Sequence, residues 1–243
     1  MGLNLQNMEA NESRSKAVCL FSGGLDSTTA LYFAIGEGCV PLALTIDYGQ
    51  LHKRELESAE KIAHHLQIEH QVISIQLPWG GSALLDPTIP IPDNQSAAQI
   101  PDEIPATYVP ARNTIFLSFA ASFAEARGAE AILIGANQLD YSGYPDCRSE
   151  YFSQFNTLLR LGTKQGFEGK ALAIVAPLVR MSKAEIVRLG HELGIPFEWT
   201  WSCYRGGEIP CMRCDACLLR AKGFQEAGVK DPLIESLIGY ERS

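Results

Sequence analysis

Phe21-Ser22-Gly23-Gly24-Leu25-Asp26-Ser27-Thr28-Thr29 is the stretch that decides the fold of this chain. It follows an apolar run, Ala17 to Phe21, that predicts a buried parallel strand, and it begins a helical pattern from Ser27 to about Glu37. A glycine pair in such a turn lets backbone N–H groups surround an anion, and the helix dipole adds to the attraction. The stretch therefore predicts a phosphate-binding loop. The alternative, a turn that merely connects strand and helix, is disfavoured by the Ser and Asp residues on both sides of the glycines.

This loop differs from the two most familiar phosphate-binding motifs. It lacks the Gly-Lys-Ser/Thr ending of a Walker loop, and it lacks the third glycine of the dinucleotide fingerprint. A different class of nucleotide-binding protein is therefore indicated.

The composition is typical of a globular protein that acts on small molecules. The chain has 243 residues, 46% of them hydrophobic, which suffices for one large domain and a small appendage. A formal charge of -8 argues against a surface that binds nucleic acid by neutralising phosphates. No apolar run approaches the ~18 residues of a membrane span, and the first fifteen residues are too polar for a signal peptide. We therefore expect a cytoplasmic protein with no membrane or nucleic-acid partner, in which residues 1–15 form a disordered tail.

Predicted strands and helices alternate along the rest of the chain. Apolar runs predict strands at 40–47, 71–75, 131–134 and 172–176. Helical spacing predicts helices at 53–66, 114–127, 150–161 and from Ser182 to about Leu193. Gly128 and Gly194 should end two of these helices, and Ser182 with Glu185 forms a predicted capping box. This alternation predicts an α/β fold with a doubly wound parallel sheet and right-handed crossovers.

Residues 78–110 interrupt the alternation. They contain seven of the thirteen prolines, which excludes a regular helix and favours a long functional loop or lid. We therefore predict three parts: the tail 1–15, a nucleotide-binding domain 16–195 with the insertion 78–110, and a C-terminal segment 196–243.

In doubly wound sheets ligands bind beyond the carboxyl ends of the strands, so residues that follow strands are candidates for the site. Asp47 ends the second strand and Tyr48 follows it, where they could hold a nucleotide or its acceptor; a helix-capping or turn role for Asp47 is equally compatible. Arg112, next to Asn113 at the head of a helix, could clamp a phosphate or carboxylate, unless it is an ordinary surface arginine. Lys183, near another helix start, is the candidate for a second positive charge on the ATP phosphates.

The segment 137–148 carries too many polar groups for an ordinary connection. Tyrosine rings can stack on a flat heterocycle and carboxylates can accept from its N–H groups, so a hydrogen-bonding base is the predicted guest. Cys147 is a candidate nucleophile, although no histidine lies near it in sequence. The candidate substrate-binding residues of the segment are Asp140, Tyr141, Ser142, Tyr144, Asp146 and Arg148.

Four cysteines near the C-terminus have the spacing of a metal site. Cys203, Cys211, Cys214 and Cys217 form the pattern C-x7-C-x2-C-x2-C. Four thiolates so close together suit a closed tetrahedral zinc site, which would fold a segment too short for a core of its own. An iron–sulfur cluster is the alternative, and the neighbouring Gly and Pro residues favour zinc.

Taken together, these motifs resemble one enzyme family. The loop SGGLDS resembles that of the PP-loop ATP pyrophosphatases, and SGGLDST, DYGQ, VPARN, DYSGYPDCR and SKAEI followed by the four cysteines resemble the QueC family of 7-cyano-7-deazaguanine (preQ0) synthases. The resemblance covers residues 16 to about 227. It departs at Ala111, where many relatives have glycine, and at Met212-Arg213, where many have a glycine in the knuckle.

The resemblance implies a Rossmann-like PP-loop domain, one structural zinc per chain, commonly a homodimer, and conversion of 7-carboxy-7-deazaguanine and ammonia to the nitrile at the expense of ATP. A carboxylate is a poor acyl donor, so ATP would first convert it to an acyl-adenylate; ammonia would then give an amide, and a second adenylation the nitrile. ATP would contact the loop, Mg²⁺ would bridge its phosphates, and Arg112 and Lys183 would offset developing charge while Asp26 orients Mg²⁺ or the loop. The ATP-binding residues would be Phe21, Ser22, Gly23, Gly24, Leu25, Asp26, Ser27, Thr28 and Asp47.

Two other readings remain open on the sequence. One is a related PP-loop enzyme that stops at the amide, joins the carboxylate to another amine, or thiolates tRNA through Cys147. The other is a zinc-ribbon binding module without catalysis.

Overall fold

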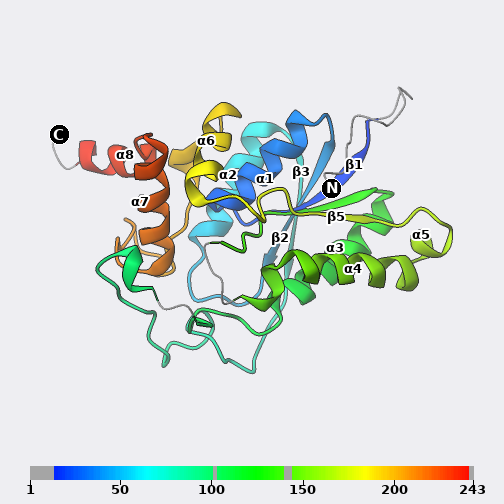
Figure 1. Cartoon of the computed structure of the whole chain (residues 1–243), viewed down its shortest axis with the longest axis horizontal. Helices are drawn as coiled ribbons and strands as arrows, with labels where there is room; N and C mark the ends of the chain where they lie inside the picture. The colour runs from blue at the N-terminus through cyan, green and yellow to red at the C-terminus, as the bar shows by residue number, and fades with distance from the viewer. Residues whose placement is uncertain (1–13, 101–102, 140–143, 241–243) are drawn as a thin grey trace.

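Five parallel strands form the centre of the molecule in a computed structural model that describes residues 14–100, 103–139 and 144–240. The strand order is β3-β2-β1-β4-β5, so the chain builds outward in one direction from β1 and then in the other (Figure 1). Each pairing is parallel. The strands are β1 (Lys16–Leu20), β2 (Val40–Asp47), β3 (Glu69–Ser74), β4 (Ala131–Ile134) and β5 (Ala173–Val175).

Helices cover both faces of this sheet, so every residue of β1 after Lys16 is buried and successive side chains join different core clusters. Val18 and Leu20 point to one face and pack with residues of α3 and α4, whereas Ala17 and Cys19 point to the other and pack with α1 and α2. Figure 1 shows α1 and α2 above the sheet and α3 and α4 below it. The helices are α1 (Leu25–Gly36), α2 (Arg54–Leu66), α3 (Arg112–Arg127), α4 (Ser149–Gly162), α5 (Lys164–Phe167), α6 (Lys183–Glu192), α7 (Asp215–Ala227) and α8 (Pro232–Tyr240), with 3₁₀ helices at Ala97–Gln99, Pro145–Cys147 and Phe197–Trp199.

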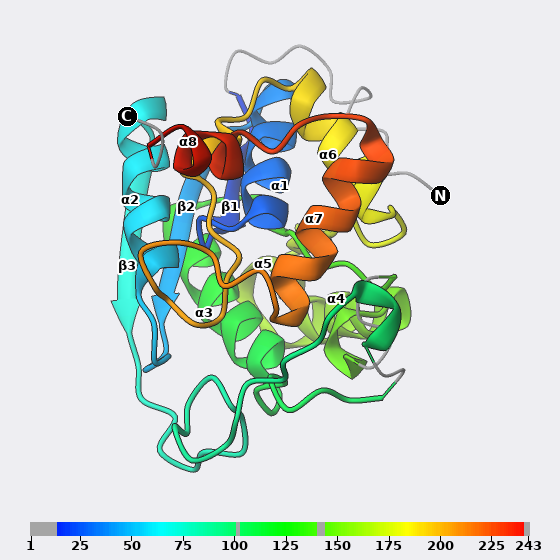
Figure 2. The same cartoon turned by 90° about the vertical axis from the view of Figure 1, so that its left-hand side faces the viewer.

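The insertion and the C-terminal segment pack against each other at one end of the sheet. The Asn94 N–H donates to the Arg213 carbonyl at 3.0 Å, and the Asn94 amide donates to Asp215 at 2.6 Å. Figure 2 shows the insertion running below the sheet and back to the side of α7. The C-terminal segment also contacts the phosphate loop directly, because the Trp201 N–H donates to the Gly23 carbonyl at 3.1 Å.

The predicted α/β fold with its doubly wound parallel sheet is confirmed, and the strand order, which the sequence did not predict, places β1 beside β4. The capping box of Ser182 and Glu185 is present, and Gly128 and Gly194 have the positive φ predicted for helix ends. Several boundaries were wrong by one or two residues: Phe21 lies beyond β1, α1 begins at Leu25 rather than Ser27, β3 begins at Glu69 rather than at residue 71, and α3 begins at Arg112 rather than at residue 114. The helices α5, α7 and α8 were not predicted.

Candidate active site

The phosphate loop connects β1 to α1 at the point where the strand order changes direction. Its hydroxyl groups close the turn: the Ser22 N–H donates to Ser27 Oγ at 3.2 Å, and the Gly24 N–H donates to Ser22 Oγ at 3.3 Å. Ser27 Oγ donates to the Gly24 carbonyl at 3.2 Å. The turn is therefore held in shape by its own serines, and α1 begins immediately after it.

The two glycines of the loop have different surroundings. Gly23 has φ +80, and a Cβ there would lie 2.4 Å from Ala59 N and 2.5 Å from the Glu55 carbonyl oxygen. Gly24 has φ -77, and a Cβ there would lie 3.3 Å from both Ser22 Oγ and the Trp201 carbonyl oxygen. Gly23 is thus required for packing against α2, whereas Gly24 borders the cavity described next.

The loop opens into a cavity of about 250 Å³, which gathers residues from both halves of the sheet. It is lined by residues of the loop, of α2 and α3, of the turn after β4 and of the C-terminal segment. Among the predicted site residues, those that line it are Phe21, Ser22, Gly24, Leu25, Asp26, Ser27, Tyr48, Arg112, Asn113, Tyr144 and Lys183.

Asp26 and Lys183 form an ion pair on one wall of the cavity. Lys183 Nζ lies 2.7 Å from each carboxylate oxygen of Asp26, and the side chain of Lys183 is only 12% exposed. Space for the lysine stem comes from Gly223 of α7, because a Cβ at Gly223 would lie 2.3 Å from Lys183 Cγ. The pair joins α1 to α6 across the switch point of the sheet.

Arg112 enters the cavity from the start of α3. Its guanidinium carbon lies 5.9 Å from the ring centres of Tyr48 and Phe116, so aromatic faces position the cation. The preceding residue, Ala111, has φ +53, a left-handed conformation that glycine adopts at least cost.

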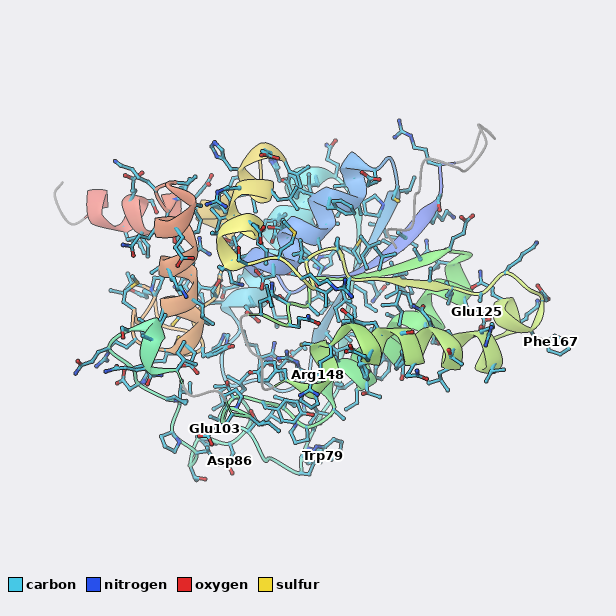
Figure 3. The ribbon with its side chains drawn as sticks, viewed as in Figure 1. Trp79, Asp86, Glu103, Glu125, Arg148 and Phe167 are labelled. Carbon is cyan, nitrogen blue, oxygen red and sulfur yellow. The ribbon has the colours of Figure 1, made fainter. Side chains whose placement is uncertain are left out.

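Several predicted site residues do not line the cavity. Asp47 accepts from Lys53 Nζ at 2.7 Å and from the Gly49 N–H at 3.3 Å, as the turn alternative described. Asp146 is buried and accepts the Asn113 N–H at 3.1 Å, which satisfies a free N–H group in the first turn of α3. Gly23 and Thr28 are also absent from the lining, and Arg148 is exposed ahead of α4 (Figure 3). Asp140, Tyr141 and Ser142 lie outside the described residues.

Cys147 lines the cavity, but its surroundings disfavour the thiolate. Burial raises the pKa of the Cys147 thiol to about 12, and Asp146 adds to this effect while Arg112 and the Asn113 amide oppose it. A thiol with so high a pKa is protonated at neutral pH and is a weak nucleophile.

Sequence reasoning missed Glu55, His52, Gly135 and Trp201. Glu55 and His52 line the cavity from α2 and the turn before it, and Trp201 lines it from the C-terminal segment. A Cβ at Gly135 would lie 2.8 Å from the backbone of Asp26, so this glycine lets the β4 turn approach the phosphate loop. Gly135 could have been found from its position directly after a strand, whereas the other three carry no local signal.

The four cysteines gather into one cluster in the C-terminal segment, compatible with metal binding. Their sulfur atoms all lie within 4.8 Å of one another. The Arg205 and Cys211 N–H groups donate to Cys203 Sγ at 3.4 and 3.3 Å, and the Cys214 N–H donates to Cys211 Sγ at 3.3 Å. Backbone N–H groups directed at sulfur stabilise thiolates, which are the form that binds a metal.

The cysteine cluster lies against the wall of the cavity. A Cβ at Gly206 would lie 2.2 Å from His52 Cβ, so the loop between Cys203 and Cys211 is packed directly on His52.

None of the helices in the described ranges has the length and apolar character that a membrane span requires.

The sheet order, the anion-binding turn at the switch point and the charged cavity define a Rossmann-like α/β protein of the PP-loop type. Comparison with known proteins narrows this class. The family described as "Queuosine biosynthesis protein QueC" matches residues 16–228, and the chain belongs to this family.

Individual relatives agree with the family match. The chain is 56% identical to a 7-cyano-7-deazaguanine synthase of Trichodesmium erythraeum, over 90% of this chain and 100% of that protein. It is 53% identical to a 7-cyano-7-deazaguanine synthase of Nostoc punctiforme, over 90% of this chain and 99% of that protein.

Among solved structures, a predicted subunit of a tRNA methyltransferase from Methanocaldococcus jannaschii is 18% identical with a TM-score of 0.47, covering 73% of this chain and 75% of that one.

Proposed function

We propose that the chain is a 7-cyano-7-deazaguanine synthase that uses ATP to convert 7-carboxy-7-deazaguanine and ammonia into the nitrile. The observation that carries this proposal is membership of the QueC family over residues 16–228, together with relatives of that name at more than half identity. The charged cavity in front of the phosphate loop supports it, since an adenylating enzyme needs an anion-binding turn and cations around one space.

In this proposal ATP is the first substrate to be positioned. Backbone N–H groups around Gly24 and the hydroxyl groups of Ser22 and Ser27 would bind its phosphates, and Arg112 would offset the charge that develops on the transferred group. Lys183, which is paired with Asp26, would place a second positive charge near the same phosphates. The Asp26 carboxylate lines the cavity and is the kind of oxygen ligand that Mg²⁺ prefers, so it would hold both Mg²⁺ and Lys183, and the ion would neutralise phosphate charge when bound.

The deazaguanine acid would occupy the part of the cavity near Tyr48, Asn113 and Tyr144. Tyrosine rings give a flat base a surface on which to stack, and the polar groups around them recognise its edge. Asp140, Tyr141, Ser142, Asp146 and Arg148 remain predicted substrate residues. In the described residues Asp146 supports this wall through Asn113.

The bound metal in the cysteine cluster would be one structural zinc. A tetrahedral zinc with Zn–S bonds of about 2.3 Å needs sulfur atoms about 3.8 Å apart. Cys211 Sγ and Cys217 Sγ are 3.9 Å apart, which fits this requirement. Four thiolates leave no open position for substrate, so the zinc would hold the segment 196–243 against the nucleotide-binding domain 16–195.

A homodimer is also proposed, on the family resemblance. Exposed apolar side chains on α4 and α5 support it, among them Leu161 at 76% exposure and Phe167, which Figure 3 labels, at 90% exposure. Sedimentation of the purified protein tests this part.

Mass spectrometry of the reaction products tests the function. The purified protein is incubated with 7-carboxy-7-deazaguanine, ATP, Mg²⁺ and ammonium, and we expect the nitrile, AMP and pyrophosphate. Accumulation of the amide without nitrile would instead assign a related enzyme that stops one step earlier. Absence of ATP-dependent pyrophosphate release would contradict catalysis of this kind.

A further inference from the structure

Glu55 lines the cavity, but the reaction proposed above does not use it. It lies in the first turn of α2, partly buried, and it lines the cavity beside the phosphate loop. Across the described parts of the chain its carboxylate has no hydrogen bond and no ion pair. Arg112 attracts its charge from farther away, but a partly buried carboxylate with no hydrogen-bond donor is costly, so it indicates an absent donor ligand.

Three oxygen atoms face the space beside Gly24. Measured from the position that a Cβ would take on that residue, Ser22 Oγ and the Trp201 carbonyl oxygen are 3.3 Å away and Glu55 Oε1 is 3.8 Å away. The carbonyl and carboxylate oxygens are pure acceptors, and the hydroxyl can accept as well. Such a set suits a small ligand that carries several N–H donors.

His52 is a second, independent sign of a missing donor. It is 8% exposed, it lines the same cavity, and its Nδ1 is buried without a hydrogen-bond partner in the residues that the structure describes. An unpaired ring nitrogen is an acceptor in one tautomer of the neutral ring. His52 and Glu55 thus both line the cavity, and each carries a polar atom without a hydrogen-bond partner in the described residues.

We propose that Glu55, with the Trp201 carbonyl and the Ser22 hydroxyl, forms the ammonium-binding subsite, and that Glu55 is the base that accepts protons from the substrate nitrogen. This inference rests on the proposed function and adds to it the nitrogen donor and the proton acceptor. Burial raises the pKa of Glu55 to about 7, against the opposing effect of Arg112, so the carboxylate can both take and release protons near neutral pH.

The proton balance explains why such a base is needed. Bound ammonium first loses one proton to Glu55, and the free electron pair of the resulting ammonia then attacks the acyl-adenylate carbonyl carbon. A C–N bond forms, the bond from carbon to the AMP oxygen breaks with its electron pair going to AMP, and a second proton leaves the nitrogen to give the amide. Each proton passes from Glu55 to solvent before the next is taken.

The second half of the reaction makes the same demand. The amide oxygen attacks the α-phosphorus of a second ATP, and pyrophosphate leaves with its electron pair. The remaining two N–H protons are then removed as the bond from carbon to the AMP oxygen breaks, which leaves the nitrile and AMP. A nitrogen that enters as ammonium thus loses four protons in the site.

Separate measurement of the two half-reactions in the Glu55→Gln variant tests the proposal. Exchange of pyrophosphate into ATP in the presence of 7-carboxy-7-deazaguanine does not require ammonium, so we expect its rate to stay within about threefold of wild type. The rates of amide and nitrile formation from ammonium should fall about a hundredfold or more. Hydroxylamine is largely unprotonated at neutral pH and should bypass the base, so hydroxamate formation should be retained. Glu55→Asp keeps a carboxylate, so its rate of ammonium use should lie between those of wild type and Glu55→Gln. Glu60→Gln, an exposed change on the same helix, is the matched control.

A binding measurement keeps the subsite testable without turnover. Ammonium chloride should raise the unfolding temperature of the wild type more than tetramethylammonium chloride does, and Glu55→Gln should abolish that difference. Equal loss of pyrophosphate exchange and of ammonium use in Glu55→Gln would overturn the subsite, as would wild-type ammonium use or the same ammonium stabilisation in both proteins. If the wild type gives neither nitrile nor amide yet shows the Glu55-dependent stabilisation, the proposed function fails and the subsite stands.

Discussion

Gly23 and Gly24 are adjacent in sequence, yet their substitution should have different consequences. Gly23 needs a positive φ and touches the α2 backbone, so any side chain there strains the fold. Gly24 has an extended conformation that other residues adopt freely, and only its side toward the cavity is restricted.

Gly24→Val should therefore reduce turnover without unfolding the protein. The added methyl groups would enter the space beside Ser22 Oγ and the Trp201 carbonyl, which is the proposed ammonium subsite next to the phosphate-binding turn. We expect kcat/KM to fall at least about a hundredfold, with an unfolding temperature close to that of wild type. Gly36→Ala is the control, because a Cβ at the end of α1 meets only Leu193 at 3.5 Å. Wild-type activity in Gly24→Val would refute the role of this glycine.

Glu55 should leave a signature in the pH dependence of stability. Its pKa of about 7 in the folded protein lies above the ordinary value of 4.5, so the folded state holds the proton more tightly than the unfolded chain. Stability from this group is complete below about pH 4.5 and is lost as the pH rises through 7. The neutral Glu55→Gln variant should thus gain stability over wild type between pH 5 and 8, by up to about 3 kcal/mol. Chemical denaturation at several pH values measures this, and a pH-independent difference would contradict it.

At the scale of elements, contact between α6 and α7 controls the position of Lys183. Gly223 on α7 leaves room for the lysine stem, which in turn places Nζ on Asp26 of α1. Three helices that lie far apart in sequence thus define one ion pair on the cavity wall.

Gly223→Ala should impair catalysis from outside the cavity. Its Cβ would lie 2.3 Å from Lys183 Cγ and would displace the lysine, whereas alanine is the better helix former by about 1 kcal/mol. We expect kcat/KM for ATP to fall about tenfold or more while helical circular dichroism is unchanged. Lys222→Ala, an exposed change on the same helix, serves as the control. Unchanged kinetics in Gly223→Ala would show that Lys183 has no such role.

At the scale of the whole molecule, the cysteine cluster joins the C-terminal segment to the cavity. Trp201 donates to the phosphate loop, Gly206 packs on His52, and Asn94 of the insertion bonds to Arg213 and Asp215 beside the cysteines. Three parts of the chain thus meet around one predicted metal site.

Metal loss should therefore remove stability and activity together. We expect elemental analysis to find about one zinc per chain, and we expect Cys214→Ser to lose that zinc and to lower the unfolding temperature, because metal binding and local folding are coupled. Activity should fall as well, since the segment forms a wall of the cavity. Cys19→Ser changes a buried cysteine outside the cluster and should keep the zinc. Iron with visible absorption, or a Cys214→Ser variant with full zinc content, would contradict the assignment.

The sequence by itself determined what depends on neighbouring residues. The β2 and β4 boundaries, the caps at Ser182, Gly128 and Gly194, and the alternation of strand and helix follow from local periodicity and local hydrogen bonds. The anion-binding turn and the cysteine spacing are also local, since each places its groups within a few residues. The missed helices α7 and α8 lie where the cysteines dominated the interpretation.

Only the tertiary structure decided which side chains share the cavity. The strand order brings β4 beside β1, and this places Gly135 against Asp26. Packing of α7 on α6 positions Lys183. The C-terminal segment brings Trp201 to the phosphate loop. Glu55 and His52 read in the sequence as ordinary residues near a helix start, and Asp47 and Arg148 read as site residues although they do not line the cavity. The reason is physical: long-range packing sets which groups are buried together, and a residue's charge and hydrogen-bond partners depend on that burial rather than on its neighbours in the chain.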